Sequence, residues 1–236
     1  MTLNTEPPAP TDASPDSDKK LPSPTLTASV YGQLRSDVVS GRLQPGAKLR
    51  AESLRKRFNT GGSPVREALN RLLAEGFVSL VEQKGFRVAP ISREELAELL
   101  NARILIDGTA ITESIRRFER DWEEGLVLAL HHLSRAPRGT TDASGDSPWD
   151  ARHKAFHLSL VAGCGSRWMR RMSEQLFDAA ERYRLVALPW IPERNELDEH
   201  RALVDACLSR NATHAIELLK SHYGQTVDAI VKSGRI

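Results

Sequence analysis

The stretch from Ser63 to Leu72 reads SPVREALNRL, and it predicts the first half of a helix with a defined start. We expect the Ser63 hydroxyl to accept a hydrogen bond from an unpaired backbone N–H at that start. Pro64 would then occupy the first helical position, where its missing N–H costs nothing. A stripe of buried residues at helical spacing is predicted at Val65, Leu69 and Leu72.

Polar residues lie off this stripe, at Arg66, Asn70 and Arg71. A helix start offers free backbone N–H groups, and with an early arginine it suits a phosphate backbone and base edges. The alternative is an ordinary amphipathic helix with solvated basic residues, and this stretch alone favours that alternative. The flanking sequence decides between the two interpretations.

The sequence before this helix predicts two further short helices. Apolar residues recur every four positions over 28–40, which is typical of a helix. A short basic helix is expected over 51–58, and the sequence NTGG at 59–62 breaks the chain before Ser63. Two short helices joined by a tight glycine-containing turn predict a helix-turn-helix whose second helix reads DNA.

The sequence after this helix predicts a β-hairpin. The helix is expected to end near Glu75, and strands are expected over 77–81 and 86–88 with Lys84 at a basic tip. A helix-turn-helix followed by a basic hairpin is a winged helix-turn-helix. The candidate DNA-contacting residues are Arg50, Ser63, Arg66, Asn70, Arg71, Lys84 and Gly85.

Charge supports a nucleic-acid partner for this part of the chain. The net charge is only +2, but residues 25–92 carry eleven Lys and Arg against five Asp and Glu. The segments 1–24 and 93–236 are each slightly acidic. A basic N-terminal third predicts binding to nucleic acid, and we assign 25–92 as a DNA-binding domain.

Composition limits the remaining possibilities. The 236 residues are 40% hydrophobic, enough for one large or two small domains. No apolar run approaches the ~20 residues of a membrane span, and we see no secretion signal, so we expect a cytoplasmic protein. Cys164 and Cys207 lack metal-type spacing and are expected to be buried thiols. The proline-rich, apolar-poor segment 1–24 predicts a disordered tail.

Helical periodicity continues through almost all of residues 93–236, and no strand-like alternation of any length occurs there. The candidate helices are 93–117, 121–135, 149–163, 166–187, 195–209 and 211–232, with a polar loop at 140–148. We therefore predict a mainly α chain, in which a winged helix-turn-helix precedes an all-α antiparallel helical bundle.

Four histidines form a second candidate site. His153 and His157 are four residues apart and share one helix face, while His200 and His222 lie on the last two helices. Three helices could bring the four imidazoles together, and imidazole nitrogen is a good ligand for zinc and other divalent ions. The alternative is a set of ordinary surface histidines, which is what we expect of the other three.

The N-terminal part resembles the GntR family of bacterial transcription regulators. The resemblance rests on the segment LQPGAKLRAESLRKRFNTGGSPVREALNRLLAEGFV and on QKGFRVAPIS after it, which contain the pattern PVREAL-x-RL-x-x-EG-x-V. Many members carry Ser-Arg-Thr before the proline, whereas this chain has Gly61-Gly62-Ser63. An arginine that often contacts DNA is thus absent at Gly62, which affects the operator sequence and not DNA binding itself.

Residues 93–232 resemble the effector-binding FCD domain of the FadR-type branch, an antiparallel helical bundle that carries a divalent ion such as zinc. The pattern of that branch is matched by Arg103, His157, His200 and His222. His153 stands where the first ligand is usually Asp, and four neutral ligands leave the ion dicationic and attractive to an anion. A transfer of this role to Asp150 is the alternative, and Asp150 could instead orient the His153 ring.

The same resemblance implies a small carboxylate effector that ligates the metal and pairs with an arginine. Arg103 is the main candidate for that pairing, and the further candidates are Arg152, Tyr183 and Arg184. The segments HKAFHLSLVAGCGS, LFDAAERYR and QKGFRVA are similar to the carbon-starvation repressor group that controls glutarate and 2-hydroxyglutarate catabolism. That similarity implies glutarate or 2-hydroxyglutarate as effector.

The leading hypothesis is a homodimeric repressor that binds a palindromic operator and leaves it when the effector binds. The domains would be 1–24, a tail; 25–92, for DNA binding; and 93–236, for effector binding and dimerisation. An activator with a different organic-acid effector is one alternative. A metalloenzyme whose histidine cluster activates water is another, although no motif places a general base beside these histidines.

Overall fold

The structure is a computed structural model that describes residues 25–141, 147–191 and 194–236. The tail predicted over 1–24 lies outside the described residues, and so does most of the loop predicted over 140–148. Within the described residues, no helix is long and apolar enough to cross a membrane.

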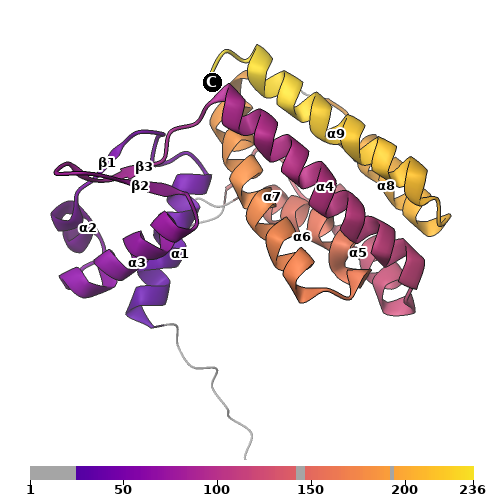
Figure 1. The fold of residues 1–236 in the computed structure, drawn as a ribbon, viewed down its shortest axis with the longest axis horizontal. Coiled ribbons are helices and arrows are strands. Elements are labelled where there is room, and N and C mark those ends of the chain that lie inside the picture. Colours follow the sequence, from indigo (N-terminus) through magenta and orange to yellow (C-terminus); the bar gives the residue numbers. More distant parts are fainter. Residues whose placement is uncertain (1–24, 142–146, 192–193) are drawn as a thin grey trace, which may run out of the picture.

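The first part of the chain is a winged helix-turn-helix (Figure 1). Its elements are α1 (Leu26–Val39), β1 (Lys48–Leu49), α2 (Ala51–Arg57), α3 (Gly62–Ala74), β2 (Val78–Val81) and β3 (Gly85–Val88). Strand β3 lies between β1 and β2 and is antiparallel to both. In register, Leu80 lies opposite Phe86, and Lys48 lies opposite Arg87. Strand β1 was not predicted, because two residues are too few to show the alternation of apolar and polar side chains that marks a strand.

The predicted stripe of α3 forms the centre of the N-terminal core. Val65, Leu69 and Leu72 have no exposed surface, which confirms the helical spacing. They pack with Val30, Leu34 and Val38 of α1, with Leu54 of α2, and with Val78 and Val88 of the sheet. This packing fixes α3 against α1 and leaves the opposite side of α3 exposed.

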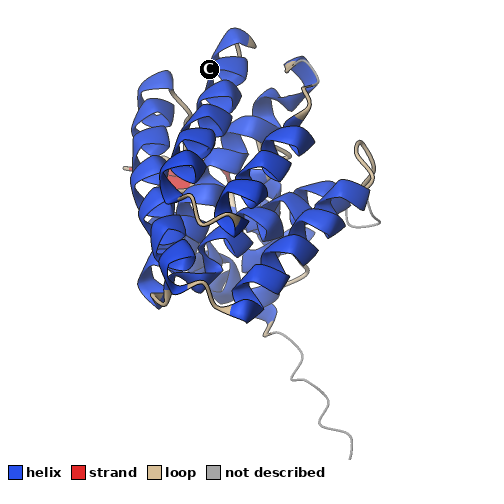
Figure 2. Ribbon diagram, turned by 90° about the vertical axis from the view of Figure 1, so that its right-hand side faces the viewer, coloured by secondary structure: helices blue, strands red, loops and turns tan. Residues whose placement is uncertain are grey.

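The second part of the chain is a bundle of long helices, which Figure 2 shows from the side. Its elements are α4 (Arg93–Arg117), α5 (Arg120–Arg135), α6 (Pro148–Val161), the 3-10 turn η1 (Ala162–Cys164), α7 (Arg167–Ala187), the 3-10 turn η2 (Leu188–Trp190), α8 (Glu196–Leu208) and α9 (Ala212–Lys232). The prediction of a mainly α chain is confirmed. Each predicted helix is found with its ends displaced by two residues or fewer.

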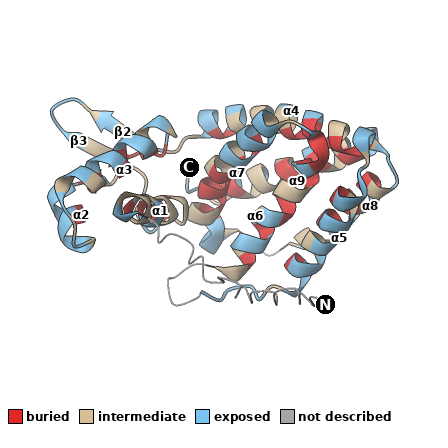
Figure 3. Cartoon of the chain, turned by 90° about the horizontal axis from the view of Figure 1, so that it is seen from below, coloured by how far each residue is buried: buried red, intermediate tan, exposed pale blue. Residues whose placement is uncertain are grey.

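Polar caps explain why these helices begin where they do. The side chains of Ser92, Ser147, Ser166 and Asn211 each accept a hydrogen bond from the backbone N–H three residues later. Pro148 follows one of these caps at the start of α6, a position that proline favours. The buried residues gather where α4, α6, α7 and α9 face one another (Figure 3).

One close approach of the bundle requires glycine. A Cβ added to Gly163 in η1 would lie 2.8 Å from Cγ of Trp122, a buried side chain at the start of α5. The indole Nε1–H of Trp122 donates to the backbone carbonyl of Ser159 at 3.0 Å, so the ring is fixed.

Both cysteines are free and buried as expected, and burial raises the pKa of the Cys207 thiol to about 12.

Helix α7 joins the two parts of the chain through Asp178. The Asp178 carboxylate is 4% exposed and accepts from Arg35 of α1 at 2.5 Å and from Lys154 of α6 at 2.9 Å. Arg35 also contacts Glu75, at the end of α3, at 3.3 Å. A line of ion pairs therefore runs from the middle of the bundle to the winged helix-turn-helix.

The next turn of α7 holds the segment between the two parts. Arg182 donates to the backbone carbonyl of Ala89. The Tyr183 hydroxyl donates to Glu95 and accepts from the backbone N–H of Ser92 at 3.4 Å. Burial, and the Glu95 carboxylate beside it, raise the pKa of Tyr183. These bonds fix the start of α4 against α7.

Candidate functional site

The exposed side of α3 carries the predicted DNA-contacting residues. Ser63, Arg66 and Asn70 are all exposed. A hollow between α2 and the start of α3 is lined by Arg55, Lys56 and Arg66 among others. The basic residues of α2 were not among the predicted contacts, although three of them follow one another in the sequence. A negative phosphate group would fit this hollow.

The start of α3 differs from the prediction. The helix begins at Gly62 with Gly61 as its cap, and no side chain caps it. Ser63 is therefore inside the first turn rather than at the cap, and the prediction that its hydroxyl caps the helix is wrong. Pro64 is the third helical residue. The backbone N–H at this position has no acceptor within the helix, so its absence in proline costs no hydrogen bond. The first backbone N–H groups of α3 remain open to a ligand.

Arg71 lies on a different side of α3 from Arg66. Its guanidinium lies 3.8 Å from the ring centroid of Tyr31 in α1. The Tyr31 hydroxyl donates to Glu75 at 2.6 Å, and this bond together with burial raises the pKa of Tyr31. Arg71 is thus engaged with α1, and Arg66 is the freer of the two predicted arginines.

The remaining predicted contacts lie at the edges of this surface. Lys84 and Gly85 are exposed at the hairpin turn, as predicted. The turn also contains exposed Glu82, so its charge is mixed rather than purely basic. Arg50 is exposed at the residue before α2 and makes no capping hydrogen bond.

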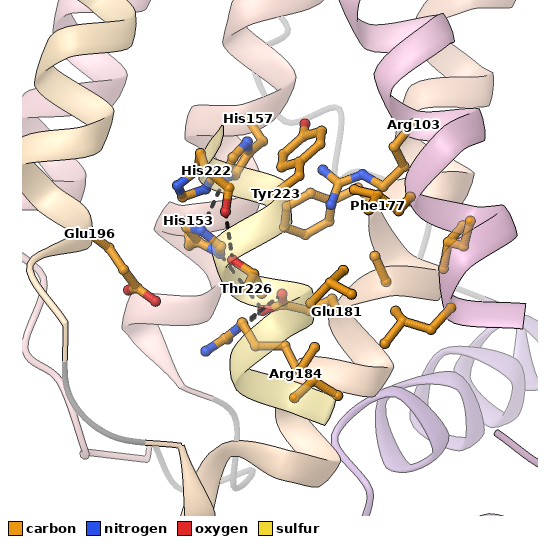
Figure 4. Close-up of a pocket in the computed structure, with 16 residues that line it drawn as sticks. Arg103, His153, His157, Phe177, Glu181, Arg184, Glu196, His222, Tyr223 and Thr226 are labelled. Carbon is orange, nitrogen blue, oxygen red and sulfur yellow. Dashed lines mark hydrogen bonds and ion pairs between the residues drawn. The ribbon is translucent and has the colours of Figure 1, made fainter. Parts of the chain in front are cut away.

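Inside the bundle, the four predicted histidines meet. All four are buried, and one nitrogen from each lies within 4.8 Å of the others. Helix α6 provides His153 and His157, whose Nε2 atoms lie 3.0 Å apart, while α8 provides His200 and α9 provides His222. Figure 4 shows His153, His157 and His222 turned toward one another in this cluster, which we call the histidine cluster.

Burial disfavours protonation of three histidines of the cluster, His157, His200 and His222. Loss of solvent lowers the pKa of His157 well below its usual value, and the neighbouring imidazoles lower it further. Burial likewise lowers the pKa of His200 and of His222. Within the part of the chain that the structure describes, both ring nitrogens of His200, and Nδ1 of His153 and of His157, have no hydrogen-bond partner. Unpaired lone pairs in a buried site fit a bound cation, because a ligating imidazole must be neutral.

Two glutamates that the sequence did not single out lie beside the cluster. Glu199 accepts from Nδ1 of His222 at 2.7 Å, and an oxygen of Glu181 lies 3.8 Å from Nδ1 of His153. Burial alone would raise the pKa of Glu181, but the bound Arg184 guanidinium holds it well below its usual range. Glu199 is adjacent to His200 in sequence, but no local pattern connects it to His222.

A cavity next to the cluster is lined by Arg103, Phe177, Tyr223 and three of the histidines (Figure 4). The Arg103 guanidinium lies 3.9 Å from the Tyr223 ring centroid, and its Nε is 3.6 Å from Asp107 and has no hydrogen bond. Arg103 therefore lines the cavity with its Nε–H donor unpaired among the described residues, as the prediction of an effector-binding residue requires.

The other predicted effector contacts fare differently. Arg184 lines the cavity, but its guanidinium is already bound by Glu181 and by Asp150, each at 2.5 Å. Asp150 is thus engaged by Arg184 and stands outside the histidine cluster, which contradicts both of its predicted roles. Arg152 is exposed and does not line the cavity. Tyr183 packs at the junction described above and, like Arg152, is not among the residues that line the cavity, so the cavity gives no support to an effector contact by either residue.

A winged helix-turn-helix joined to a helical domain whose cavity is lined by histidines, an arginine and apolar side chains is the architecture of a DNA-binding regulator with a sensor domain. Residues 26–88 match the family described as bacterial regulatory proteins, gntR family, and residues 98–225 match the FCD domain. The chain belongs to the gntR family and carries an FCD domain.

Named relatives agree with this assignment. The chain is 38% identical over 197 residues to the HTH-type transcriptional repressor GlaR of Escherichia coli (strain K12), covering 81% of this chain and 90% of GlaR. It is 34% identical to the uncharacterized regulator BphR of Paraburkholderia xenovorans (strain LB400), covering 89% and 87%. The fold is similar to that of E. coli McbR/YncC, with a TM-score of 0.74 and 20% identity over 89% of this chain and 99% of the other.

These relatives are regulators of transcription and not enzymes. The metalloenzyme alternative is therefore wrong, and the histidine cluster belongs to a regulatory domain. The resemblance to the GntR family and to its branch with an FCD domain is confirmed.

Proposed function

We propose that the protein is a homodimeric transcriptional repressor that releases its operator when a small dicarboxylate binds beside a metal ion in the FCD domain. The observation that carries this proposal is a buried cluster of four histidines, three of which line one cavity together with Arg103. The glutarate or 2-hydroxyglutarate effector and the zinc ion are parts of the proposal.

The chemistry of the cluster supports a divalent ion, with zinc as the candidate. His153, His157, His200 and His222 would hold it, since neutral imidazoles are common zinc ligands and these four are already close enough to share an ion. When bound, the ion supplies positive charge and an open coordination position for a carboxylate oxygen.

The cavity supports a carboxylate with an apolar middle. The buried Nε–H of Arg103 has no hydrogen-bond partner among the described residues and suits an oxygen of one carboxylate, and the ion would attract the other carboxylate. Leucine and valine side chains line the same cavity, at Leu96, Leu99, Leu100 and Val227. A short dicarboxylate has charge at its two ends and methylene groups between them, which matches this combination.

The N-terminal part supports operator binding through α3. We assign the main phosphate and base contacts to Arg66 and Asn70, with Ser63, Arg50, Lys84 and Gly85 around them, and a lesser part to Arg71. Two copies would bind the half-sites of a palindrome. Exposed apolar side chains on α4 and α7 support pairing of two copies, since Leu105 is 68% exposed and Trp168 is 61% exposed.

The test is fluorescence anisotropy of the zinc-loaded protein on its own upstream DNA at fixed salt, because phosphate contacts make affinity steeply salt-dependent. Glutarate and both enantiomers of 2-hydroxyglutarate are titrated separately. Release of DNA by one acid, and loss of that response in Arg103→Ala with DNA affinity retained, is the expected result. Tight DNA binding indifferent to all three acids would refute the effector assignment.

A further inference from the structure

We propose that Glu199 and Glu181 are positioning residues for the metal, and that each acts through one histidine and is itself held by one arginine. The inference rests on the metal site of the proposed function. It assigns two chains of contacts, from His222 to Glu199 to Arg194, and from His153 to Glu181 to Arg184.

The first chain is the shorter one. The Glu199 carboxylate lies 2.7 Å from Nδ1 of His222, so the ring donates its Nδ1 proton there and leaves Nε2 with a free lone pair. Arg194 lies 3.2 Å from the same carboxylate oxygen and also donates to Thr226 of α9 at 2.9 Å. Arg194 thereby holds Glu199 in place while Glu199 fixes the orientation of the ring.

The second chain has the same order with a longer first contact. Glu181 lies 3.8 Å from Nδ1 of His153 and receives two hydrogen bonds from Arg184, at 2.5 and 2.8 Å. Nε2 of His153 lies 3.0 Å from Nε2 of His157, so this nitrogen of His153 faces into the cluster. Figure 4 shows Glu181 and Arg184 beside His153 at the edge of the cavity.

The two chains explain how a site built from four neutral ligands can accept a dication. All four candidate ligands are imidazoles, so the ligand set itself supplies no negative charge. Glu181 and Glu199 would place two negative charges one imidazole away from a bound ion. A carboxylate behind a ligating histidine fixes its tautomer and raises its basicity, and its loss typically lowers metal affinity ~10- to 100-fold.

The experiment measures zinc affinity of the full chain by competition with a chromophoric chelator. We expect Glu199→Gln to lower the affinity by roughly 10- to 100-fold and Glu181→Gln by less, because its contact with the histidine is longer. The matched control is Asp198→Asn, since Asp198 precedes Glu199 on α8 but is exposed and contacts Arg201 and Asn195, and it should keep wild-type affinity. The absorption spectrum of bound Co²⁺ should change in Glu199→Gln and not in Asp198→Asn.

A second set of measurements separates positioning from folding. The melting temperature of each metal-free variant is compared with that of the metal-free wild type, and Glu199→Asp should recover part of the zinc affinity. Wild-type zinc affinity and an unchanged Co²⁺ spectrum in both glutamine variants would overturn the inference and leave the metal site intact. If the wild-type protein itself bound no zinc, the metal site of the proposed function would be refuted. The positioning roles of Glu199 and Glu181 would then be refuted as well.

Discussion

Replacement of Asp178 by Asn should loosen the junction between the bundle and the winged helix-turn-helix. The carboxylate is 4% exposed and pairs with Arg35 and Lys154, whose side chains are 24% and 29% exposed. Burial lowers the pKa of Arg35, but pairing with Asp178 offsets this and leaves the pKa raised overall. The substitution therefore leaves two cations facing each other without their shared anion.

The size of the effect follows from this exposure. Breaking a fully buried pair costs about 3–5 kcal/mol, whereas exposed pairs contribute about 0–1 kcal/mol. The two cations retain about a quarter of their surface in water and can rehydrate in part, so we expect a loss of about 2 kcal/mol. The matched control is Glu174→Gln, because Glu174 also pairs with Lys154 at 2.9 Å but is 51% exposed and does not contact Arg35. It should change stability by less than about 0.5 kcal/mol.

The assay uses the placement of the tryptophans. All four lie between residues 122 and 190, so their fluorescence reports unfolding of the bundle alone, whereas far-UV circular dichroism reports both parts. In urea, the two signals should separate in Asp178→Asn more than in the wild type, with the transition of the winged part moved to lower urea. Identical transitions for wild type and variant would refute the assignment of Asp178 to the junction.

Three other predictions test the rest of the structure. Arg66→Ala should weaken operator binding by roughly 1–3 kcal/mol, measured by fluorescence anisotropy. Arg71→Ala should weaken it by less, because Arg71 is stacked on Tyr31 of α1. An equal loss in the two variants would show that both arginines contact DNA. Gly163→Ala should lower stability in thermal unfolding by about 1–3 kcal/mol through its clash with Trp122, whereas Gly224→Ala, whose Cβ would meet nothing within 4 Å, should not. Chelation of zinc supplied at 100 times its dissociation constant should remove about 2.7 kcal/mol in the same assay, and an unmoved melting temperature would count against a structural metal.

The sequence predicted most of the fold because its signals are local. Long helices with polar caps and apolar residues three or four apart are defined by their own residues, so α4 is found with its predicted ends. Strand β1 was missed because it has only two residues. Its partners, Arg87 opposite Lys48 and Phe86 opposite Leu49, lie far away in the sequence. The start of α3 was misplaced because serine before proline favours a cap, whereas the chain leaves that position to Gly61.

The site was predicted only in part because its contacts are not local. The four histidines carry a recognisable spacing, and the structure brings them together. The glutamates that contact the histidines have no recognisable spacing in the sequence, since Glu199 lies 23 residues from His222 and Glu181 lies 28 residues from His153. Asp150 was placed one turn from His153 by spacing alone, and only the tertiary structure assigns it to Arg184 instead.

The C-terminal half of α7 has a consequence for how this chain can change over evolutionary time. Residues 177–187 include no exposed side chain, although four consecutive ones are Glu181, Arg182, Tyr183 and Arg184. One side of this segment faces the histidines, and another holds the DNA-binding part. A substitution that adapts the cavity to a new acid must therefore leave the junction unharmed, so new specificities should arise more readily on α4 or α9 than on α7.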